Sequence, residues 1–204
     1  MTQYLLVATK NQGKIEEYKV LLEDLSIALL GLTDVEIDIT VDETGSSFEA
    51  NAILKATQYA TVASLLTLAD DSGLVVDALE GRPGVHTARY GGSGLTPIDR
   101  YQLLLEEMRG IEWSRRTARF HCVIALAHKS ALVGIAHGIC EGMIADRPRG
   151  EGGFGYDPVF YLPEMGKTMA ELSSAEKHEI SHRGAAMRRV RPLIKQALSD
   201  LSSH

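Results

Sequence analysis

Two adjacent carboxylates, Asp70 and Asp71, follow an apolar run in the segment LADDSG, which spans residues 68–73. The run before them has the length and apolarity of a buried strand, so the pair is expected where that strand ends. Like charges that are held close together repel, and each loses hydration when it is buried. The chain must therefore solvate the pair or place positive charge beside it. A polar turn would solvate it, because Asp, Ser and Gly are common turn residues.

The first part of the chain indicates an α/β fold. An apolar run at residues 3–8 has strand length and ends in the polar loop TKNQGK, residues 9–14. Apolar residues at helical spacing follow, which gives a strand-loop-helix opening. Alternating apolar and polar residues at 35–41 predict a half-exposed strand. Ser46 and Glu49 then have the spacing of a capping box, so a helix is expected to begin there.

Later segments continue this alternation of strands and helices. Residues 65–69 and 74–79 predict two strands separated by the acidic turn. A helix is expected to begin at Thr96 and to run to about Arg109. Two long β-rich runs, separated by the dipeptide KS, suggest an antiparallel hairpin. The C-terminal region is predicted to be helical, with a cap at Ser173 and a kink or break at Pro192.

The composition limits the partners that the chain can have. Its 204 residues are 45% hydrophobic and 24% charged, with a net charge of −6. This composition is ordinary for a globular domain and argues against a surface that binds nucleic acid or anionic membranes. Cys122 and Cys140 lie in apolar runs without metal-ligand spacing, which favours a reducing, cytoplasmic compartment. We expect no signal peptide and no membrane-spanning segment, because the apolar stretches are too short.

Two kinds of charged loop follow the predicted strands. Lys10 and Lys14 precede a helix start, where backbone N–H groups favour a phosphate site. An exposed cationic turn is the alternative, because no Walker A sequence occurs in the chain. The turns DETG (42–45) and DDSG (70–73) both place acids after strands. One such turn would be unremarkable, but oxygen ligands in pairs suit Mg²⁺.

Two further segments carry aromatic and basic side chains. Phe154 and Tyr156 flank a glycine in the loop GGFGYDP. Such a ring can stack on a nucleobase, or it can anchor the loop to the core. In EKHEISHRG, residues 176–184, His178 and His182 have i,i+4 spacing, but the neighbouring sequence offers no third ligand for zinc. A basic helix start that faces a phosphate or a base is the alternative to a solvated helix.

Acids, cations, an aromatic ring and helix N-termini together suit magnesium-dependent chemistry on a nucleoside polyphosphate. The chain resembles the inosine triphosphate pyrophosphatase family through the ordered motifs TKNQGK, SFEANAILKA, ADDSGLVVDALEGRPGVHTARYGG, RFHCVIAL, GGFGYDPVF and GKTMAELSSAEKHEISHRGAA. The resemblance runs from Leu5 to about Leu198. It implies one α/β domain over residues 1–204 without a separable linker. An elongated mixed β-sheet with flanking helices would form two lobes around a central cleft.

The resemblance also implies an activity. Family members hydrolyse the α–β phosphoanhydride of ITP, dITP and XTP, release the monophosphate and pyrophosphate, and require Mg²⁺. A homodimer is expected, with a nucleoside triphosphate as substrate and with no nucleic-acid or membrane partner. Two alternatives stay open: a pyrophosphatase for other modified nucleotides, and a nucleotide-binding regulator without catalysis. The chain argues against a regulator without catalysis, because it retains Asp70, Asp71, Lys14 and Lys177.

The resemblance assigns site residues position by position. Asp71 would be the general base and a metal ligand, and either Asp42 or Glu43 would be the second acid at the metal. Lys55 is a weaker phosphate candidate. Residues 9–14 would hold the triphosphate and residues 154–157 the base. The full set of implied substrate contacts is Thr9, Lys10, Asn11, Gln12, Gly13, Lys14, Ser72, Phe154, Gly155, Tyr156, Asp157, Lys177, His182 and Arg183.

Overall fold

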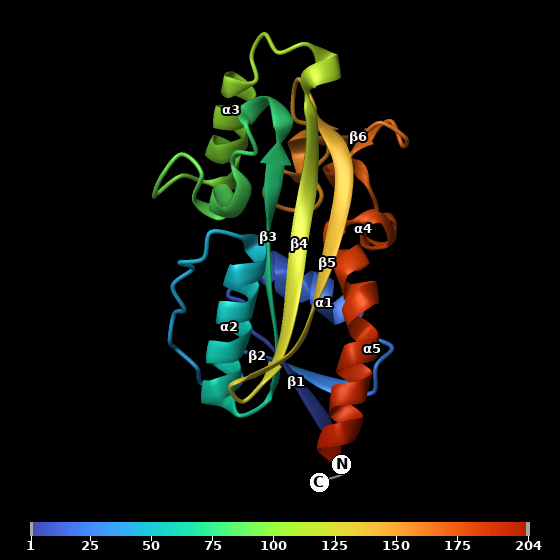
Figure 1. Cartoon of the computed structure of the whole chain (residues 1–204). Helices are drawn as coiled ribbons and strands as arrows, with labels where there is room; N and C mark the ends of the chain where they lie inside the picture. Colours follow the sequence, from blue (N-terminus) through green and yellow to red (C-terminus); the bar gives the residue numbers. More distant parts are fainter. Residues whose placement is uncertain (1, 203–204) are drawn as a thin grey trace. The chain divides into compact units, whose positions relative to one another are not determined.

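The computed structural model describes residues 2–202 and has a seven-stranded mixed sheet with flanking helices in that range (Figure 1). Its strands are β1 (Gln3–Val7), β2 (Ile27–Gly31), β3 (Leu66–Val76), β4 (Thr117–His128), β5 (Ala131–Ile144), β6 (Phe160–Leu162) and β7 (Lys167–Thr168). They are ordered β2-β1-β3-β4-β5-β6-β7 across the sheet. β1 pairs in parallel with β2 and β3, whereas β6 pairs antiparallel with β5 and β7. The expected α/β class with a mixed sheet is confirmed.

The longer helices begin where polar side chains cap them. They are α1 (Gln12–Leu21), α2 (Phe48–Ala63), α3 (Pro97–Glu107), α4 (Ser174–Ile180) and α5 (His182–Ser202). Thr96 and Asp99 form a capping box at α3, and Ser173 and Glu176 form one at α4, as expected. Across the part of the chain that the structure describes, no helix has the length and apolarity that crossing a membrane requires.

The chain divides into two compact units, each built from separate stretches of sequence. The first contains the residues up to Asp71, then Cys122–Gly138 and the residues from Arg183 onward. The second contains Ser72–His121 and Ile139–His182. β3, β4 and β5 each contribute residues to both units, because the unit boundaries fall within these strands. The two lobes, the cleft and the single domain stay predictions.

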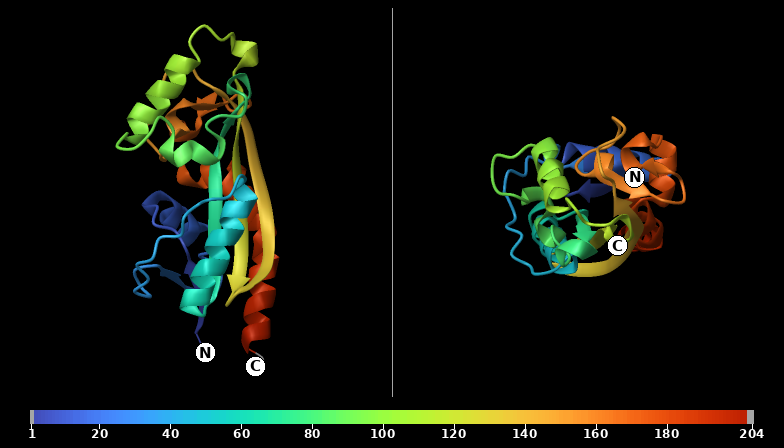
Figure 2. Two further views of the ribbon diagram at one scale, coloured as in Figure 1. Left: turned by 60° about the vertical axis from the view of Figure 1, so that its left-hand side comes forward. Right: turned by 90° about the horizontal axis from the view of Figure 1, so that it is seen from above.

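The first unit is a layered arrangement with helices on both faces of its strands. Leu66 and Leu68 on β3 belong to a buried core that also contains Tyr18 of α1 and Ile194 of α5. α2 buries Ala52, Ala56 and Ala60 together with the larger Phe48 and Tyr59, and it lies across the strands from α5 (Figure 2). α1 and α5 therefore share one face of β3, and α2 covers the other.

The second unit has its own core. Leu74 and Val76 at the end of β3 pack with Leu104 of α3 and with a pair of phenylalanines. These phenylalanines, Phe120 and Phe160, have ring centroids 4.5 Å apart. Each unit thus buries its own apolar residues, and β3 supplies side chains to both cores.

The expected turn at residues 70–73 is wrong. β3 is one continuous strand from Leu66 to Val76 and includes Asp70 and Asp71 in its middle. Both aspartates are buried, at 2% and 6% exposure. The turn-forming composition is overridden because basic side chains from other segments meet each carboxylate, so the strand can continue through them.

Four local expectations differ from the structure. Residues 35–41 form turns and irregular structure, and the outer strand is instead β2. The N-cap of α2 is Ser47, one residue later than expected, and it accepts a hydrogen bond from the Ala50 N–H. The C-terminal region contains two helices, and Pro192 lies inside α5 and does not break it, while a kink there stays a prediction. Burial of the neighbouring Val190 and Ile194 offsets the hydrogen bond that proline removes.

We predict that Arg116→Leu lowers the free energy of unfolding by about 2–4 kcal/mol, because it leaves buried carbonyl groups without a donor. The Arg116 guanidinium is buried and donates to the carbonyls of Met108, Ile144 and Ala145 at 2.9, 2.7 and 3.0 Å. Urea unfolding measures the effect. The exposed Arg109 pairs with the exposed Glu106 on its own turn, so Arg109→Leu should change stability by no more than about 0.5 kcal/mol. Equal losses in the two variants would contradict the prediction.

Candidate active site

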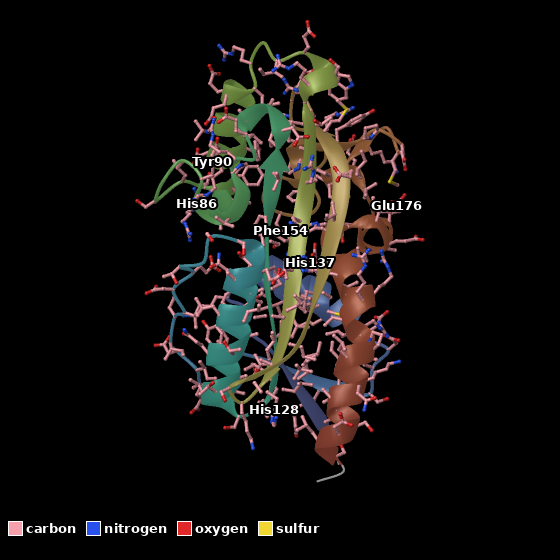
Figure 3. The ribbon with its side chains drawn as sticks, viewed as in Figure 1. His86, Tyr90, His128, His137, Phe154 and Glu176 are labelled. Atoms are coloured by element: carbon pink, nitrogen blue, oxygen red, sulfur yellow. The ribbon has the colours of Figure 1, made fainter. Side chains whose placement is uncertain are left out.

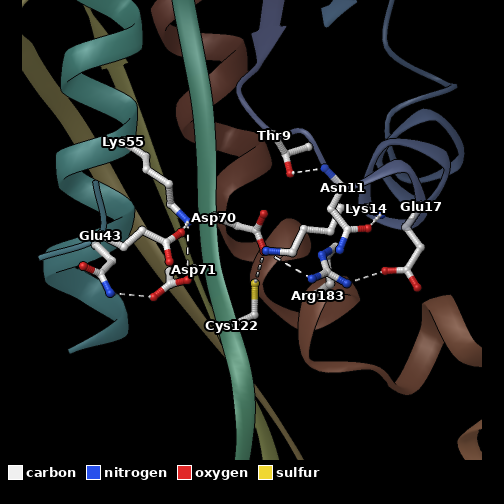
Figure 4. A network of polar contacts seen from close by, with 11 residues as sticks. Thr9, Asn11, Lys14, Glu17, Glu43, Lys55, Asp70, Asp71, Cys122 and Arg183 are labelled. Atoms are coloured by element: carbon white, nitrogen blue, oxygen red, sulfur yellow. Dashed lines mark hydrogen bonds and ion pairs between the residues drawn. The ribbon is translucent and has the colours of Figure 1, made fainter. Parts of the chain in front are cut away.

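The strand geometry separates the two adjacent carboxylates. Successive side chains of a strand point to opposite faces, so Asp70 and Asp71 leave β3 in opposite directions. Figure 4 shows Asp70 on the side of Lys14 and Arg183, and Asp71 on the side of Lys55 and Glu43. Each carboxylate therefore has its own basic partners, and the strand lies between the two charges.

Asp70 is held in a buried network of ion pairs. Its Oδ2 lies 2.9 Å from Lys14 Nζ and 3.2 Å from Arg183 Nη2. Arg183 in turn donates to Glu17, which sits one helical turn after Lys14 on α1. Burial alone would raise the pKa of Asp70, but the charges of Lys14 and Arg183 outweigh it and hold the pKa far below its usual range. Asp70 is therefore a fixed negative charge.

Asp71 is compensated less completely. Lys55 Nζ lies 3.3 Å from Asp71 Oδ1, and Asn51 Nδ2 donates to Asp71 Oδ2 at 3.1 Å. Lys55 also contacts Glu43, with 2.5 Å between Nζ and Oε1. Burial raises the pKa of Asp71 above its ordinary value, Lys55 works against this, and the Glu43 charge adds to it. A carboxylate with a raised pKa is the stronger proton acceptor of the two.

The loop at residues 9–14 forms the start of α1. Asn11 is the N-cap, and its Oδ1 accepts from the Lys14 N–H at 3.2 Å. Thr9 Oγ1 accepts from the Asn11 N–H at 3.2 Å, which closes the turn before the helix (Figure 4). Lys10 donates to Thr40 and Gln12 to Glu16. The N-terminus of α1, whose partial positive charge suits a phosphate, thus sits beside the Lys14 ammonium.

The Gly-rich loop at 152–158 brings three predicted contacts together inside the second unit. Asp157 Oδ2 accepts from the Phe154 N–H at 2.8 Å and from Lys177 Nζ at 2.7 Å. The same ammonium lies 4.7 Å from the centre of the Phe154 ring. Figure 3 labels Phe154. Gly155 has a φ of +63°, a conformation that glycine adopts without strain. Lys177 and Asp157 therefore hold a half-buried aromatic ring in a defined place.

The remaining predicted contacts lie in more enclosed positions. His182 is buried and stacks on Phe120 with ring centroids 4.8 Å apart. Tyr156 is buried, and its hydroxyl donates to the Thr87 carbonyl at 3.2 Å. Arg183 is only 1% exposed. Ser72 follows Asp71 on β3 and begins the second unit. Direct substrate contact by these four residues stays a prediction.

The chain matches a known family over most of its length. A profile of the Ham1 family matches residues 5–193. The chain belongs to the Ham1 family. It is 49% identical over 183 residues to the dITP/XTP pyrophosphatase of Geobacillus kaustophilus, an alignment that covers 90% of each protein. It is 45% identical to the protein of the same name from Halalkalibacterium halodurans, over 91% of this chain and 95% of the relative.

Solved structures of Ham1 proteins share the fold. A HAM1 protein from Coxiella burnetii has a TM-score of 0.86 and 42% identity, over 96% of this chain and 100% of that one. The Staphylococcus aureus Ham1 protein has a TM-score of 0.84 and 39% identity over the same shares. The resemblance noted in the sequence motifs is thus confirmed at the level of family and fold.

The acidic residues of this Ham1 chain have the chemistry that a divalent cation needs. The Lys55 ammonium lies between oxygens of Glu43 and Asp71, so this space already suits a positive charge. Carboxylate oxygens are the ligands that Mg²⁺ prefers. Asp42 is exposed, and Glu43 is the acid of that turn that lies near Asp71. Residues 2–202 contain no cluster of three or more His, Cys, Asp or Glu suited to a metal, so water and phosphate oxygens would complete the coordination.

Sequence reasoning missed two residues of the site. Glu17 and Asn51 are both buried polar residues, and they bind Arg183 and Asp71 respectively. For Asn51 a signal existed, because its i,i+4 spacing from Lys55 places both side chains on one face of α2. For Glu17 the partner is 166 residues away, and no local pattern predicts it.

We predict that Asp70→Asn lowers the free energy of unfolding by about 3–5 kcal/mol, because it leaves Lys14 and the buried Arg183 without their shared counter-charge. Asp71→Asn should cost only roughly 1 kcal/mol, because Lys55 keeps its contact with Glu43. The two variants make the same chemical change at neighbouring positions, so each controls for the other. Urea unfolding at neutral pH measures both, and a larger loss in Asp71→Asn would contradict the assignment of Asp70 as the structural charge.

Proposed function

We propose that this protein hydrolyses ITP, dITP and XTP to the nucleoside monophosphate and pyrophosphate in a reaction that requires Mg²⁺. Membership of the Ham1 family and relatives named dITP/XTP pyrophosphatase support the substrate class. The observation that carries the mechanism is the buried Asp71, whose two oxygens contact Lys55 and Asn51 and whose pKa is raised. A proton acceptor in a fixed orientation is what attack by water on a phosphorus requires.

In the proposed reaction, Asp71 accepts a proton from the water that attacks the α-phosphorus. The new P–O bond forms as the bond to the bridging oxygen breaks, and pyrophosphate leaves. Lys14 and the N-terminus of α1 bind the phosphates and offset their charge. Lys55 holds one oxygen of Asp71 and adds a second cation near the phosphates. Positioning and charge stabilisation contribute most of the catalysis, since phosphoryl transfer needs little covalent chemistry from the protein.

Glu43 and Asp71 are the residues that would hold Mg²⁺, with Asp42 in the same turn. The bound ion supplies a Lewis acid that neutralises phosphate charge. Lys55 would then share its carboxylate partners with the ion, and its ammonium would become available to a phosphate oxygen. This arrangement explains how one lysine can serve both the empty and the loaded protein.

Base selectivity is assigned to the second unit, where Phe154 offers a ring for stacking. Hypoxanthine and xanthine present an O6 acceptor and an N1–H donor, whereas adenine reverses both. A buried group left unpaired costs about 1–3 kcal/mol, so two mismatches give a strong preference. Asp157, His182 and backbone N–H groups of this unit are candidates for reading this edge, and Arg183, which belongs to the first unit, is a further candidate. The homodimer and the cytoplasmic location stay predictions.

We predict that the purified protein releases pyrophosphate from ITP and XTP with Mg²⁺ and loses this activity in EDTA. Asp71→Asn should lower kcat at least about 100-fold, because the proton acceptor is removed. Asp77→Asn is the matched control, since it makes the same change at an acid that pairs with Arg119 and Thr117 outside the proposed site.

A panel of ITP, XTP, ATP, dUTP and dTTP separates the proposal from its alternatives. Preference for dUTP or dTTP would favour a pyrophosphatase for modified pyrimidines. Nucleotide binding without pyrophosphate release would identify a regulator. Full activity without metal would contradict the proposed role of Glu43 and Asp71 as magnesium ligands.

We predict that Phe154→Ala raises the KM for ITP roughly 5- to 100-fold with a small change in kcat, because stacking on a base contributes about 1–3 kcal/mol. Tyr161→Ala is a suitable control, as Tyr161 is an aromatic residue of the same unit that contacts Trp113 and Arg149. Steady-state kinetics measure both variants. An unchanged KM in Phe154→Ala would leave Phe154 as an anchor of the Gly-rich loop.

A further inference from the structure

We infer that Asn51 is a positioning residue whose buried amide joins the Asp71 carboxylate to the turn that carries Glu43. This inference rests on the proposed function, because Asn51 acts through the proton acceptor assigned there. Asn51 lies in the first turns of α2 and is fully buried. A buried amide must satisfy both its donor and its acceptor. The partners that satisfy it define the role.

The two ends of the amide bind two different segments. Asn51 Oδ1 accepts from the Gly45 N–H at 2.8 Å, and Asn51 Nδ2 donates to Asp71 Oδ2 at 3.1 Å. A backbone N–H can only donate, so the oxygen of the amide must face Gly45. The NH₂ group must then face Asp71, where it requires an accepting oxygen. The Gly45 contact therefore fixes which end of Asn51 meets the carboxylate.

The carboxylate of Asp71 is in turn fixed at both oxygens. Asn51 donates to Oδ2, and the Lys55 ammonium lies 3.3 Å from Oδ1. Two donors on two oxygens restrict the rotation of the carboxylate plane. Lys55 also binds Glu43, which lies two residues before Gly45. The contacts thus close a ring that runs from Asp71 through Asn51 to the acidic turn and back through Lys55.

The ring requires a glycine at position 45. A Cβ atom at this position would lie 2.6 Å from Asn51 Oδ1 and 2.8 Å from Ala50 Cβ. Both separations are too short for any side chain, so the turn approaches α2 this closely only with glycine. The close approach brings the Gly45 N–H to the amide and sets the position of Glu43. Gly45→Ala therefore forces the turn and the Asn51 amide apart, although the Asn51 side chain keeps its donor group.

Three variants test the acceptor Oδ1 and the donor Nδ2 of the Asn51 amide separately. Asn51→Asp keeps an acceptor for the Gly45 N–H and replaces the donor to Asp71 by a carboxylate. Asn51→Leu removes both the donor and the acceptor, and Gly45→Ala breaks the contact between the turn and the amide while it keeps the Asn51 side chain. Tyr59→Phe is the matched control, because it removes another hydrogen bond of α2, from the Tyr59 hydroxyl to the Ile39 carbonyl. Thermal unfolding shows which variants fold.

The expected kinetic result is a fall in kcat of about 10- to 100-fold for Asn51→Asp, as is usual when a partner that orients a catalytic group is lost. KM for ITP should change less than about threefold, because the phosphate and base contacts lie elsewhere. Tyr59→Phe should keep the wild-type kcat. A residue that only stabilises the turn would lower the unfolding temperature of Asn51→Leu and leave kcat of Asn51→Asp unchanged, which would overturn the inference.

A second readout does not depend on activity. In NMR spectra of the free protein, the Gly45 amide proton should resonate downfield, keep this shift in Asn51→Asp, and lose it in Asn51→Leu. The Asn51 side-chain NH₂ signals should move in Asp71→Ala. If the wild-type protein hydrolyses none of the nucleotides, the proposed function fails. The NMR signals still show whether the Asn51 amide links Asp71 to the Gly45 N–H. If it hydrolyses ITP but the signals or kcat do not respond, the inference alone fails.

Discussion

The site depends on one constraint, the alternation of side chains along β3. Two adjacent aspartates in a turn would face the same solvent and repel each other, but in a strand they leave on opposite faces. Asp70 meets Lys14 and Arg183, and Asp71 meets Lys55 and Asn51. Burial of both carboxylates becomes tolerable because each has basic partners of its own.

The two faces give the two carboxylates different chemical roles. Burial works to raise the pKa of both carboxylates, but the cations around Asp70, mainly Lys14 and Arg183, hold its pKa low, whereas the pKa of Asp71 stays raised although Lys55 opposes the effect of burial. Asp70 thereby fixes the ammonium of Lys14 beside the N-terminus of α1. Asp71 keeps the affinity for a proton that a general base needs. The surroundings thus make one aspartate a structural charge and suit the other to the proposed role of general base.

Hydrophobic periodicity was enough to predict the α/β class and the hairpin strands, and polar capping residues predicted the starts of α3 and α4. Residue composition failed at residues 70–73, where its preference for a turn was overridden by partners distant in sequence. Arg183 lies 113 residues after Asp70, and no local pattern shows that contact. Family motifs named Asp71 and Lys14, but only coordinates show that Glu43, rather than the exposed Asp42, lies beside Lys55.

The choice of an amide at position 51 follows from the same electrostatic logic. A second lysine there would orient Asp71 equally well, but its charge would lower the pKa of the carboxylate as Lys14 and Arg183 lower that of Asp70. A neutral donor fixes the geometry with a much smaller effect on basicity. Lys55 then balances the charge of the Asp71 carboxylate, a role that a bound cation can share. Asn51 fixes the orientation of that carboxylate through a hydrogen bond that a cation cannot form. Orientation and charge compensation are thus divided between two side chains one turn apart on α2.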